Sequence, residues 1–537
     1  MAYAAEVTLI AVAIPVPAAA AISRAIESAR AAKAQGADLV EWRVDSLAED
    51  PDGPTAIATL VRDSPMPCIV TVRDEREGGA FSGSDEERIA MWIAASEVIP
   101  APAYIDVELS TYHTRSSIRE AINRIAHAKS TQGKSAHAVD QPRIILSFHD
   151  YSGRAPGLSA RVAEMWADPG SAISKVVWTA RTVRDNLEAF ELLRMRAKPT
   201  IALCMGEHGL MSRVLAPKFG GFLTYARIDE HGTAPGQPTT HELIADWNFR
   251  AITPRTKVYG VVGFPIAHSR SPAIHNAWFR AANVDARMFA MAVAPVWESF
   301  KATMAEMFES PVLDFFGAAV TVGHKQHAIR FVEEAGGVVD PRAKRIGAAN
   351  TIGRGADGLL FAINTDVDAV IDALAGAAMR GKRALVLGAG GAARAAAFGI
   401  ASAGASVVIA NRTMNRAEQV AEQLARAAGD SPALDVRAME LSALGSQRFD
   451  IVVNCTSVGM EGGGASSENP LPRGVRLDDS SVVLDAVYAP AVTPLLAHAA
   501  ACGSRCVGGF EMFLAQARRQ FEAWTGSPPP TGGPPCY

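Results

Sequence analysis

Short apolar runs alternate with longer amphipathic stretches through the first 250 residues of the chain. The apolar runs have the length of buried strands, and they lie at 7–14, 38–44, 67–72, 102–107, 143–148, 174–178, 199–204 and 221–226. Alanine-rich stretches with helical spacing separate most of them, such as 18–34, 84–97 and 182–195. Eight strand–helix units in about 240 residues predict a (β/α)8 barrel. A doubly wound open sheet is the alternative, because periodicity alone does not show closure.

A polar segment with a proline, NFRAITPRTK at 248–257, separates this pattern from a second one. A new strand, VYGVVGF, follows it, and a third stretch opens with the apolar run at 383–388. The Pro/Gly-rich end of the chain is typical of disorder. We therefore expect a barrel in 1–250, an α/β domain in 256–370 with a helix at 508–525, a nucleotide-binding domain in 371–507 and a disordered tail in 526–537.

Composition and charge narrow the classes of protein. The chain has 537 residues, is 49% hydrophobic and carries a net charge of −4, so it has no basic surface for nucleic acid or for membranes. No apolar run reaches the roughly 18 residues that a membrane helix needs. The apolar stretch at 7–21 is interrupted by two prolines and no basic segment precedes it, so it does not resemble a signal peptide.

Cysteine usage indicates a reducing compartment. The six cysteines are scattered, and only Cys502 and Cys506 lie close together. A single C-x3-C pair is a poor zinc signal, so we expect reduced thiols and no metal site. These features favour the cytoplasm, and a plastid protein without its transit peptide would have the same sequence. The sequence does not indicate an oligomeric state.

A glycine-rich turn follows the strand at 385–387. It reads Gly388-Ala389-Gly390-Gly391-Ala392-Ala393 and leads into the helical stretch ARAAAFGIASAG. Strand, G-x-G-x-x-A and helix in this order are typical of dinucleotide binding. The glycines let the backbone approach a pyrophosphate, whose charge then lies at the helix N-terminus.

The end of the next strand, ASVVIA, indicates which dinucleotide is bound. It continues into Asn411-Arg412-Thr413, where an NAD-binding protein would place an acidic residue for the ribose hydroxyls. Arg412 and Arg416, one helical turn on, would instead pair with a 2′-phosphate. The sequence therefore favours NADP over NAD.

Four segments of the second half combine hydroxyl, amide and charged groups. Ser269 and Ser271 share one loop, Thr321 precedes Lys325 at the end of a strand, and Asn350-Thr351 and Asn364-Thr365-Asp366 follow. A lysine at a strand end is usually a solvated charge. Together, however, these groups suit the binding of a small polyol and the transfer of a proton.

These segments resemble shikimate dehydrogenase over 256–525. The motifs that carry the resemblance also include NCTSVG at 454–459, Tyr488 after LDAV, and GFEMFLAQ at 509–516. The resemblance implies a two-lobed module with a Rossmann NADP-binding domain, in which Lys325 and Asp366 form the catalytic pair. It implies substrate contacts from Ser269, Ser271, Thr321, Asn350, Asp366, Tyr488 and Gln516. It implies cofactor contacts from Gly388, Ala389, Gly390, Gly391, Ala392, Asn411, Arg412, Thr413, Arg416, Thr456 and Gly509.

Two positions depart from that family. The family usually has N-V-T-x-P before the lysine, whereas this chain has Ala319 and Gly323 at the first and last of these positions. Ala319 removes a polar group, and Gly323 loosens a turn that proline would stiffen. We expect both to affect substrate affinity more than chemistry, and quinate stays open as an alternative substrate.

Polar residues collect near the ends of the strands in the first half, where a barrel places its active site. Lys175 lies within the apolar strand AISKVVWTA, and His149 ends the preceding strand. A lysine in a dry, cation-rich cavity readily forms an imine. The alternative for Lys175 is a charge on the barrel rim that points outward.

The same region resembles type I 3-dehydroquinate dehydratase over 6–248. The matching motifs are EWRVD, VRDEREGG, SFHD, SK, Met211-Ser212-Arg213 and Ala234-Pro235-Gly236-Gln237. The resemblance implies that Lys175 forms a Schiff base with the substrate ketone, that His149 moves the proton and that Glu77 orients His149. It implies that the substrate is held by Glu41, Arg43, Arg73, Arg213 and Gln237.

The order of the two halves resembles a bifunctional enzyme of the shikimate pathway, fused as in plants. It would dehydrate 3-dehydroquinate to 3-dehydroshikimate and reduce this with NADPH to shikimate, and its partners would be these small molecules, without nucleic acid or membrane. The alternatives are an enzyme with one working site, a dehydrogenase that accepts quinate, and a quinate-sensing regulator. The last would have lost catalytic residues, whereas all four of Lys175, His149, Lys325 and Asp366 are present.

Overall fold

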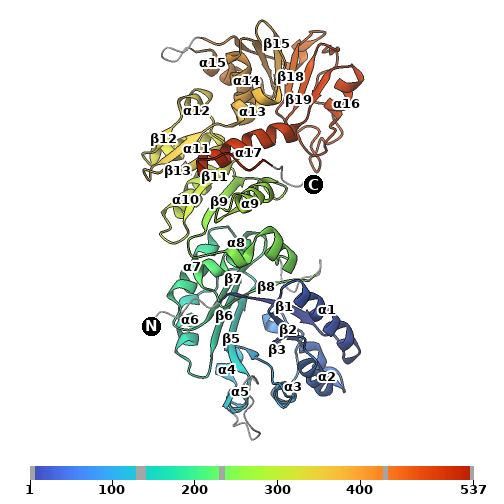
Figure 1. The fold of residues 1–537 in the computed structure, drawn as a ribbon, viewed down its shortest axis with the longest axis vertical. Coiled ribbons are helices and arrows are strands. Elements are labelled where there is room, and N and C mark those ends of the chain that lie inside the picture. Colours follow the sequence, from blue (N-terminus) through green and yellow to red (C-terminus); the bar gives the residue numbers. More distant parts are fainter. Residues whose placement is uncertain (1–6, 128–140, 229–235, 427–432, 532–537) are drawn as a thin grey trace. The chain divides into compact units, whose positions relative to one another are not determined.

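The computed structural model describes residues 7–127, 141–228, 236–426 and 433–531. The chain divides into two compact units, unit 1 (residues 1–256) and unit 2 (residues 257–537), which Figure 1 shows in blue to green and in green to red. Ala234 and Pro235 of the APGQ motif, and residues 532–537 of the expected tail, lie outside the described residues. No helix in the described part of the chain is long and apolar enough to cross a membrane.

Unit 1 is built around one parallel sheet of eight strands in its described residues, in the order β7-β6-β5-β4-β3-β2-β1-β8. The Phe222 amide donates to the Thr200 carbonyl at 2.9 Å, which joins β7 to the segment before β8 and brings the sheet round into a barrel. The strands are β1 (Leu9–Pro15), β2 (Leu39–Arg43), β3 (Cys68–Thr71), β4 (Tyr104–Glu108), β5 (Arg143–Asp150), β6 (Ile173–Thr179), β7 (Thr200–Met205) and β8 (Leu223–Ala226). The predicted barrel is confirmed, and the open sheet was the wrong alternative.

Helices cover the outside of this barrel (Figure 1). They are α1 (Ile22–Ala34), α2 (Gly53–Arg62), α3 (Asp85–Ser96), α4 (Leu109–Thr114), α5 (Ser116–His127), α6 (Leu158–Ala167), α7 (Asp185–Met195) and α8 (Leu210–Val214). Short 3-10 turns lie at Ala19–Ala21, Asp45–Glu49, Glu75–Glu77, Glu207–Gly209, Ala216–Phe219 and Phe249–Ala251, and a π-helical turn lies at Glu242–Asp246. Helix α3 begins with a capping box between Ser84 and Glu87, which satisfies two backbone amides at its start.

The first sheet of unit 2 is mixed. Its strand order is β10-β9-β11-β13-β14-β12, and β11 pairs antiparallel with β13. The strands are β9 (Lys257–Gly263), β10 (Ala286–Ala292), β11 (Phe315–Val320), β12 (Val338–Val339), β13 (Thr351–Arg354) and β14 (Leu360–Ile363). The accompanying helices are α9 (Ser271–Ala281), α10 (Trp297–Glu309), α11 (Lys325–Glu334), α12 (Pro341–Ile346) and α13 (Asp366–Ala373).

The second sheet of unit 2 is parallel and has the order β17-β16-β15-β18-β19-β20, in which the strand order reverses at β15. Its strands are β15 (Arg383–Leu387), β16 (Ser406–Ala410), β17 (Val436–Met439), β18 (Ile451–Asn454), β19 (Val482–Asp485) and β20 (Arg505–Val507), with helices α14 (Gly391–Ser402), α15 (Met414–Ala425) and α16 (Pro494–Ala501) and a 3-10 turn at Leu441–Leu444. This is the doubly wound arrangement that binds nucleotides where the order reverses.

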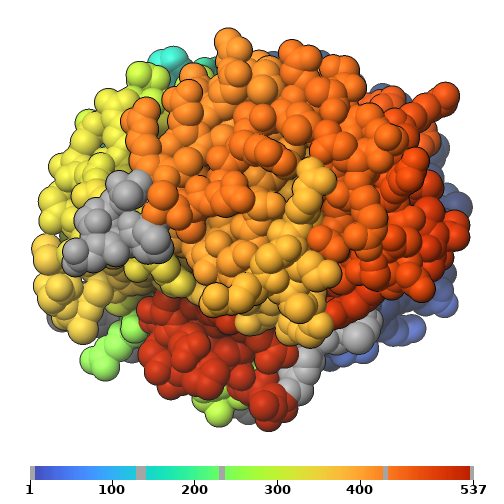
Figure 2. All heavy atoms as spheres, turned by 90° about the horizontal axis from the view of Figure 1, so that it is seen from above, coloured from blue at the N-terminus to red at the C-terminus, as the bar shows by residue number. Residues whose placement is uncertain are grey.

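The last helix, α17 (Gly509–Thr525), returns to the first sheet of unit 2. It packs on α13, α9 and β11, and Figures 1 and 2 show it in red beside the orange segments of the second sheet. Its buried Phe521 and Ala517 join Tyr259, Trp278 and Phe279 in one core. The end of the chain therefore completes the domain that β9 begins.

Candidate active sites

The interior of the barrel is apolar at one end and polar at the other. Side chains on a strand alternate between inside and outside, so residues two apart lie in successive interior layers. Leu39, Ile69, Ile145, Ile173, Ile201 and Leu223 form the apolar layer. Two residues further along their strands lie Glu41, Thr71, Ser147, Lys175, Leu203 and Tyr225. The carboxyl ends of the strands therefore present charged and hydroxyl groups to one cavity.

Lys175 lies inside this cavity, with 3% of its surface exposed. Its ammonium nitrogen lies 2.9 Å from Asp106 Oδ2, 2.9 Å from the Tyr225 hydroxyl and 3.8 Å from Glu41 Oε1. The side chain thus points inward, which excludes the outward-facing rim charge that the sequence left open. A primary amine held at a fixed point in a mostly dry cavity is suited to nucleophilic attack on a carbonyl carbon.

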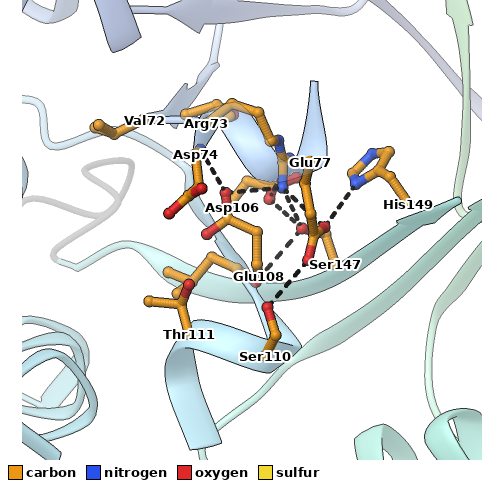
Figure 3. A network of polar contacts seen from close by, with 12 residues as sticks. Val72, Arg73, Asp74, Glu77, Asp106, Glu108, Ser110, Thr111, Ser147 and His149 are labelled. Atoms are coloured by element: carbon orange, nitrogen blue, oxygen red, sulfur yellow. Dashed lines mark hydrogen bonds and ion pairs between the residues drawn. The ribbon is translucent and has the colours of Figure 1, made fainter. Parts of the chain in front are cut away.

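Arg73 and Asp106 organise a polar network (Figure 3). Lys175 joins it through Asp106, at 2.9 Å. Arg73 donates to Asp106 Oδ1 at 2.7 Å and to Ser147 Oγ at 2.8 Å, and it lies 3.2 Å from Glu108. Ser147 in turn donates to Asp106 at 2.6 Å. Although burial favours its neutral form, Arg73 and Lys175 hold the pKa of the Asp106 carboxyl well below its usual range. Asp106 therefore stays ionised beside the lysine.

His149 and Glu77 form a second pair at the rim of the network (Figure 3). His149 Nδ1 lies 3.4 Å from Glu77 Oε2, and Ser110 donates to the other Glu77 oxygen at 3.1 Å. Burial, together with the cations Arg73 and Lys175, lowers the pKa of His149 well below 6.5. Burial raises the pKa of Glu77 to about 7, against the effect of Arg73. The imidazole is therefore neutral and available as a base at neutral pH.

One pocket gathers most of the residues that the sequence singled out in the first half. It is lined by Glu41, Arg43, Arg73, His149, Lys175, Arg213 and Gln237, together with Ala13, Tyr151, Val177, Leu203, Met205 and Tyr225. Arg213 is 1% exposed, and burial lowers its pKa to about 10. No carboxylate forms an ion pair with Arg213 within the described residues. An anionic group of a ligand could form an ion pair with this guanidinium.

In unit 2, Lys325 and Asp366 form a close ion pair. Lys325 Nζ lies 2.5 Å from Asp366 Oδ2, and Asn350 Nδ2 donates to the other Asp366 oxygen at 2.9 Å. Lys325 begins α11 after β11, and Asp366 begins α13 after β14, so both lie beyond the carboxyl ends of interior strands of the mixed sheet. The lysine side chain is 16% exposed and the aspartate side chain 7%. The carboxylate therefore holds the ammonium group in place.

Asn350 connects this pair to the C-terminal helix. Its amide donates to Thr365 Oγ1 at 2.9 Å and lies 3.4 Å from Gln516 Oε1 of α17. Thr365 also donates to the Gln516 carbonyl at 3.2 Å. The structure thus connects Lys325, through Asp366 and Asn350, to Gln516 on the C-terminal helix.

The remaining predicted substrate residues of unit 2 lie on neighbouring loops. The methyl group of Thr321 lies beside Gly263, where the loop with Ser269 and Ser271 begins. The Ser271 amide donates to Ser269 Oγ at 3.4 Å. Tyr488 packs on Phe513 of α17, three residues before Gln516. None of these four residues has a direct contact with Lys325 or Asp366 among the interactions of the described residues.

The glycine turn gives the backbone space for a dinucleotide. Gly388 has φ +110°, which disfavours any residue with a side chain, and a Cβ at Gly390 would meet no atom within 4 Å. A Cβ at Gly391 would lie 2.5 Å from Lys325 Cδ. The turn therefore leaves open space on one side and contacts the side chain of Lys325 on the other. Helix α14 begins at Gly391, so its free N-terminal amides would face the pyrophosphate of a bound dinucleotide.

The other predicted cofactor residues surround this turn. Arg412 and Arg416 are exposed where β16 meets α15, and Asn411 donates to the Thr413 carbonyl at 3.0 Å. Ala389 and Ala392 lie within the turn itself. Thr456 lies against Gly388, where its Cγ2 would be 3.3 Å from an added Cβ. Gly509 begins α17, where a Cβ would lie 2.6 Å from the Val487 carbonyl oxygen. These groups fit an NADP molecule, and exposed arginines suit its 2′-phosphate.

Ala319 and Gly323, the two departures from the shikimate dehydrogenase pattern, have different local roles. Ala319 is 5% exposed and packs with Val261, Ile266 and Trp524, so an apolar contact takes the place of a polar one. Gly323 has φ +89°, a conformation that proline cannot adopt. The turn before Lys325 therefore follows a different path from one with proline.

Sequence reasoning missed Asp106, Tyr225, Glu108 and Ser147, which the structure places next to the predicted residues of unit 1. Asp106 and Glu108 occupy alternate positions of β4, both 1% exposed. Two carboxylates in an otherwise apolar strand could have indicated a polar site, because buried acids need a cation or a hydrogen-bond donor as a partner. Tyr225 gave no such signal, since a tyrosine in a strand is common.

Comparison with known proteins covers both units. The model of type I 3-dehydroquinase matches residues 10–253. The models of the shikimate dehydrogenase substrate binding domain, of shikimate / quinate 5-dehydrogenase and of the shikimate 5'-dehydrogenase C-terminal domain match residues 261–352, 372–460 and 509–533. A bifunctional 3-dehydroquinate dehydratase/shikimate dehydrogenase, chloroplastic, from Arabidopsis thaliana is 36% identical over 520 residues, which are 92% of this chain and 79% of the relative. The chain belongs to this bifunctional family.

Of two further relatives, one matches about half of the chain and the other nearly all of it. A shikimate dehydrogenase (NADP(+)) from Anaeromyxobacter dehalogenans is 40% identical over 284 residues, 52% of this chain and 94% of the relative. The solved structure of dehydroquinate dehydratase and shikimate dehydrogenase from S. pombe AroM is 26% identical, covers 98% of this chain and 97% of its own, and has a TM-score of 0.39. The chain is thus a bifunctional enzyme, a lyase and an oxidoreductase of the shikimate pathway, and these relatives give the regulator and the quinate-accepting variant no support.

Proposed function

We propose that unit 1 dehydrates 3-dehydroquinate to 3-dehydroshikimate and that unit 2 reduces this product to shikimate with NADPH. The buried Lys175 amine between Asp106 and Tyr225 carries the first assignment, and the Lys325–Asp366 pair carries the second. We assign residues 1–250 to the dehydratase barrel, 256–370 and 508–525 to the shikimate-binding domain, 371–507 to the NADP-binding domain and 526–537 to a tail.

In unit 1, Lys175 attacks the ketone carbon of 3-dehydroquinate and forms an imine. The imine acidifies the adjacent C–H bond, and neutral His149 takes this proton and delivers it to the hydroxyl group that leaves as water. Glu77 orients the imidazole through Nδ1. Arg213, which has no acidic partner in the described chain, holds the substrate carboxylate, and Glu41, Arg43, Arg73 and Gln237 complete the pocket.

In unit 2, Lys325 donates a proton to the carbonyl oxygen of 3-dehydroshikimate. The glycine turn would hold NADPH, with Arg412 and Arg416 on its 2′-phosphate, and the bound cofactor would supply the hydride for the carbonyl carbon. Asp366 and Asn350 hold the lysine and the substrate hydroxyls in position relative to each other. Ser269, Ser271, Thr321, Tyr488 and Gln516 complete the binding of the substrate.

Incubation of the full chain with 3-dehydroquinate, followed by identification of the products, tests this proposal. We expect 3-dehydroshikimate alone without NADPH, and shikimate when NADPH is added. NADH serves as the matched control for the cofactor and should give little shikimate. If no 3-dehydroshikimate forms without NADPH, the assignment of unit 1 is wrong; if it forms but NADPH does not reduce it, the assignment of unit 2 is wrong.

A further inference from the structure

The hydroxyl group of Tyr225 lies against the amine of Lys175. Tyr225 lies on β8, is 5% exposed and lines the same pocket as the lysine. Its hydroxyl oxygen is 2.9 Å from Lys175 Nζ, and its ring centroid is 4.6 Å from the same atom. No motif in the sequence singles out this tyrosine, yet it is one of only two hydrogen-bond partners of the lysine nitrogen among the described residues.

The number of acceptors matches the geometry that the Lys175 nitrogen takes once its ammonium has given up one proton and become the attacking amine. Such an amine has two N–H bonds and one lone pair in a tetrahedral arrangement, and only the lone pair attacks a carbonyl carbon. Asp106 accepts one N–H at 2.9 Å and Tyr225 can accept the other at the same distance. With both hydrogens held, the lone pair occupies the remaining direction, away from Asp106 and Tyr225. Glu41, at 3.8 Å, is beyond hydrogen-bond distance.

We propose that Tyr225 is a further catalytic residue of unit 1, whose hydroxyl oxygen holds one N–H of the Lys175 amine and thereby aims its lone pair at the substrate ketone. This inference rests on the proposed imine chemistry of Lys175 and deepens it. Without the tyrosine hydroxyl, one N–H would lack an acceptor, and the amine could rotate about its Cε–Nζ bond.

The tyrosine keeps its own proton throughout. Its hydroxyl group hydrogen-bonds with Glu41, which also accepts from Thr71 Oγ1 at 2.6 Å. Burial, together with the charges of Glu41 and Asp106, raises the pKa of Tyr225 well above 10. Tyr225 therefore acts as a neutral phenol that accepts from the amine and donates to the carboxylate, and not as a base.

The atoms of the imine step balance without a further reagent. A C–N bond forms between Lys175 Nζ and the ketone carbon, and the C–O bond of that carbon breaks. Of the three hydrogens of the lysine ammonium, two leave with the ketone oxygen as water and one stays on the iminium nitrogen. That last N–H still has Asp106 and Tyr225 as acceptors within reach, so the same contacts hold the product of the step.

The variant Tyr225→Phe tests this inference, because it keeps the ring and removes only the hydroxyl group. The rate of imine formation is measured in the full chain at saturating 3-dehydroquinate, by trapping with borohydride and mass spectrometry of the adduct. We expect the rate to fall roughly 10- to 100-fold, as for a buried donor that is left without its acceptor. We expect the KM to change less than about twofold, since the hydroxyl contacts the lysine and not the substrate.

Tyr112→Phe is the matched control. Tyr112 is also buried in unit 1 and donates to Asn123 at 3.0 Å, but it does not line the pocket. It should leave the trapping rate unchanged, and thermal unfolding of both variants reports any loss of fold. Equal trapping by wild type and Tyr225→Phe, or an equal loss in Tyr112→Phe, overturns the role of Tyr225 alone. A wild-type chain that gives no adduct at Lys175 overturns the proposed imine chemistry as well.

Discussion

At the scale of single residues, the surroundings of the two lysines distinguish their roles. The Lys175 side chain is 4% exposed and contacts a carboxylate and a phenol in a closed interior. The Lys325 side chain is 16% exposed and forms one close ion pair with Asp366. A buried amine with a fixed lone pair suits attack on carbon, whereas an ammonium held by a single carboxylate suits proton donation.

Glu77 should set the pH dependence of the dehydratase reaction. Burial raises the pKa of Glu77 to about 7, so its carboxylate is available to orient His149 only above that pH. His149, whose pKa is lowered by burial, stays neutral across this range. We therefore expect kcat/KM to rise with pH through about 7. Glu77→Gln should remove this rise and lower the plateau roughly 10- to 100-fold, measured between about pH 5 and 9.

Ser110→Ala is the control for this assignment. Ser110 donates to Glu77, and this hydrogen bond lowers the pKa of the carboxyl group. Its removal should shift the rise in activity to higher pH and leave the plateau in place. A pH profile of Glu77→Gln that keeps the same rise would show that another group controls it.

His275 should make the stability of unit 2 sensitive to acid. It is fully buried among Trp278, Phe279 and Trp524, and burial lowers its pKa to about 3. Between pH 6.5 and 3 the unfolded chain binds a proton here that the folded chain does not, so stability falls as the pH falls. The loss at pH 4.5 is about 2–3 kcal/mol relative to pH 7.5.

The variant His275→Phe, which keeps a ring in the same core, should flatten this dependence. Thermal unfolding of the full chain between about pH 4.5 and 7.5 measures it, with the exposed His498→Gln as the control that should behave as wild type. An identical pH dependence in His275→Phe and wild type would exclude His275 as its source.

At the scale of elements, the turn between β16 and α15 should determine the choice of cofactor. Arg412 and Arg416 lie there four residues apart and exposed, and neither has an acidic partner in the described chain. Replacing each with glutamine should raise the KM for NADPH roughly 10-fold per residue and leave the KM for NADH unchanged. Arg437→Gln, on the neighbouring strand, is the exposed control. If the substitutions raised the KM for NADH as much as the KM for NADPH, the two arginines would not contact the 2′-phosphate.

The elements themselves could be predicted from sequence, because apolar runs report burial directly. The eight expected strands of unit 1 lie within about two residues of those observed, and the glycine turn lies between β15 and α14 as expected. The partners of Lys175 could not be predicted in the same way. Asp106 and Tyr225 reach the lysine only because closure of the barrel brings β4 and β8 to opposite sides of β6, and this closure depends on contacts between distant strands.

The local backbone conformation also could not be predicted from the sequence pattern. Gly323 looked like a loosened turn, whereas the structure gives it a positive φ that proline cannot adopt, with Pro295 packed against it. Ala319 looked like the loss of a polar contact and is in fact part of an apolar core. Both outcomes depend on neighbours from other elements, which periodicity does not encode.

At the scale of the whole molecule, each unit has its own sheets, its own core and its own lysine. The proposed product of unit 1 is the proposed substrate of unit 2, which gives the fusion a chemical reason. Because the described polar networks around Lys175 and Lys325 share no residue, we expect the two sites to work independently.

The most direct test of this claim is to assay Lys175→Ala and Lys325→Ala, each in the full chain, for both half-reactions. Dehydration of 3-dehydroquinate and NADPH-dependent reduction of added 3-dehydroshikimate are measured separately. Each variant should lose its own reaction by at least about 10²-fold and keep the other within about twofold of wild type. If either single substitution abolished both reactions, the account of two independent sites would be wrong.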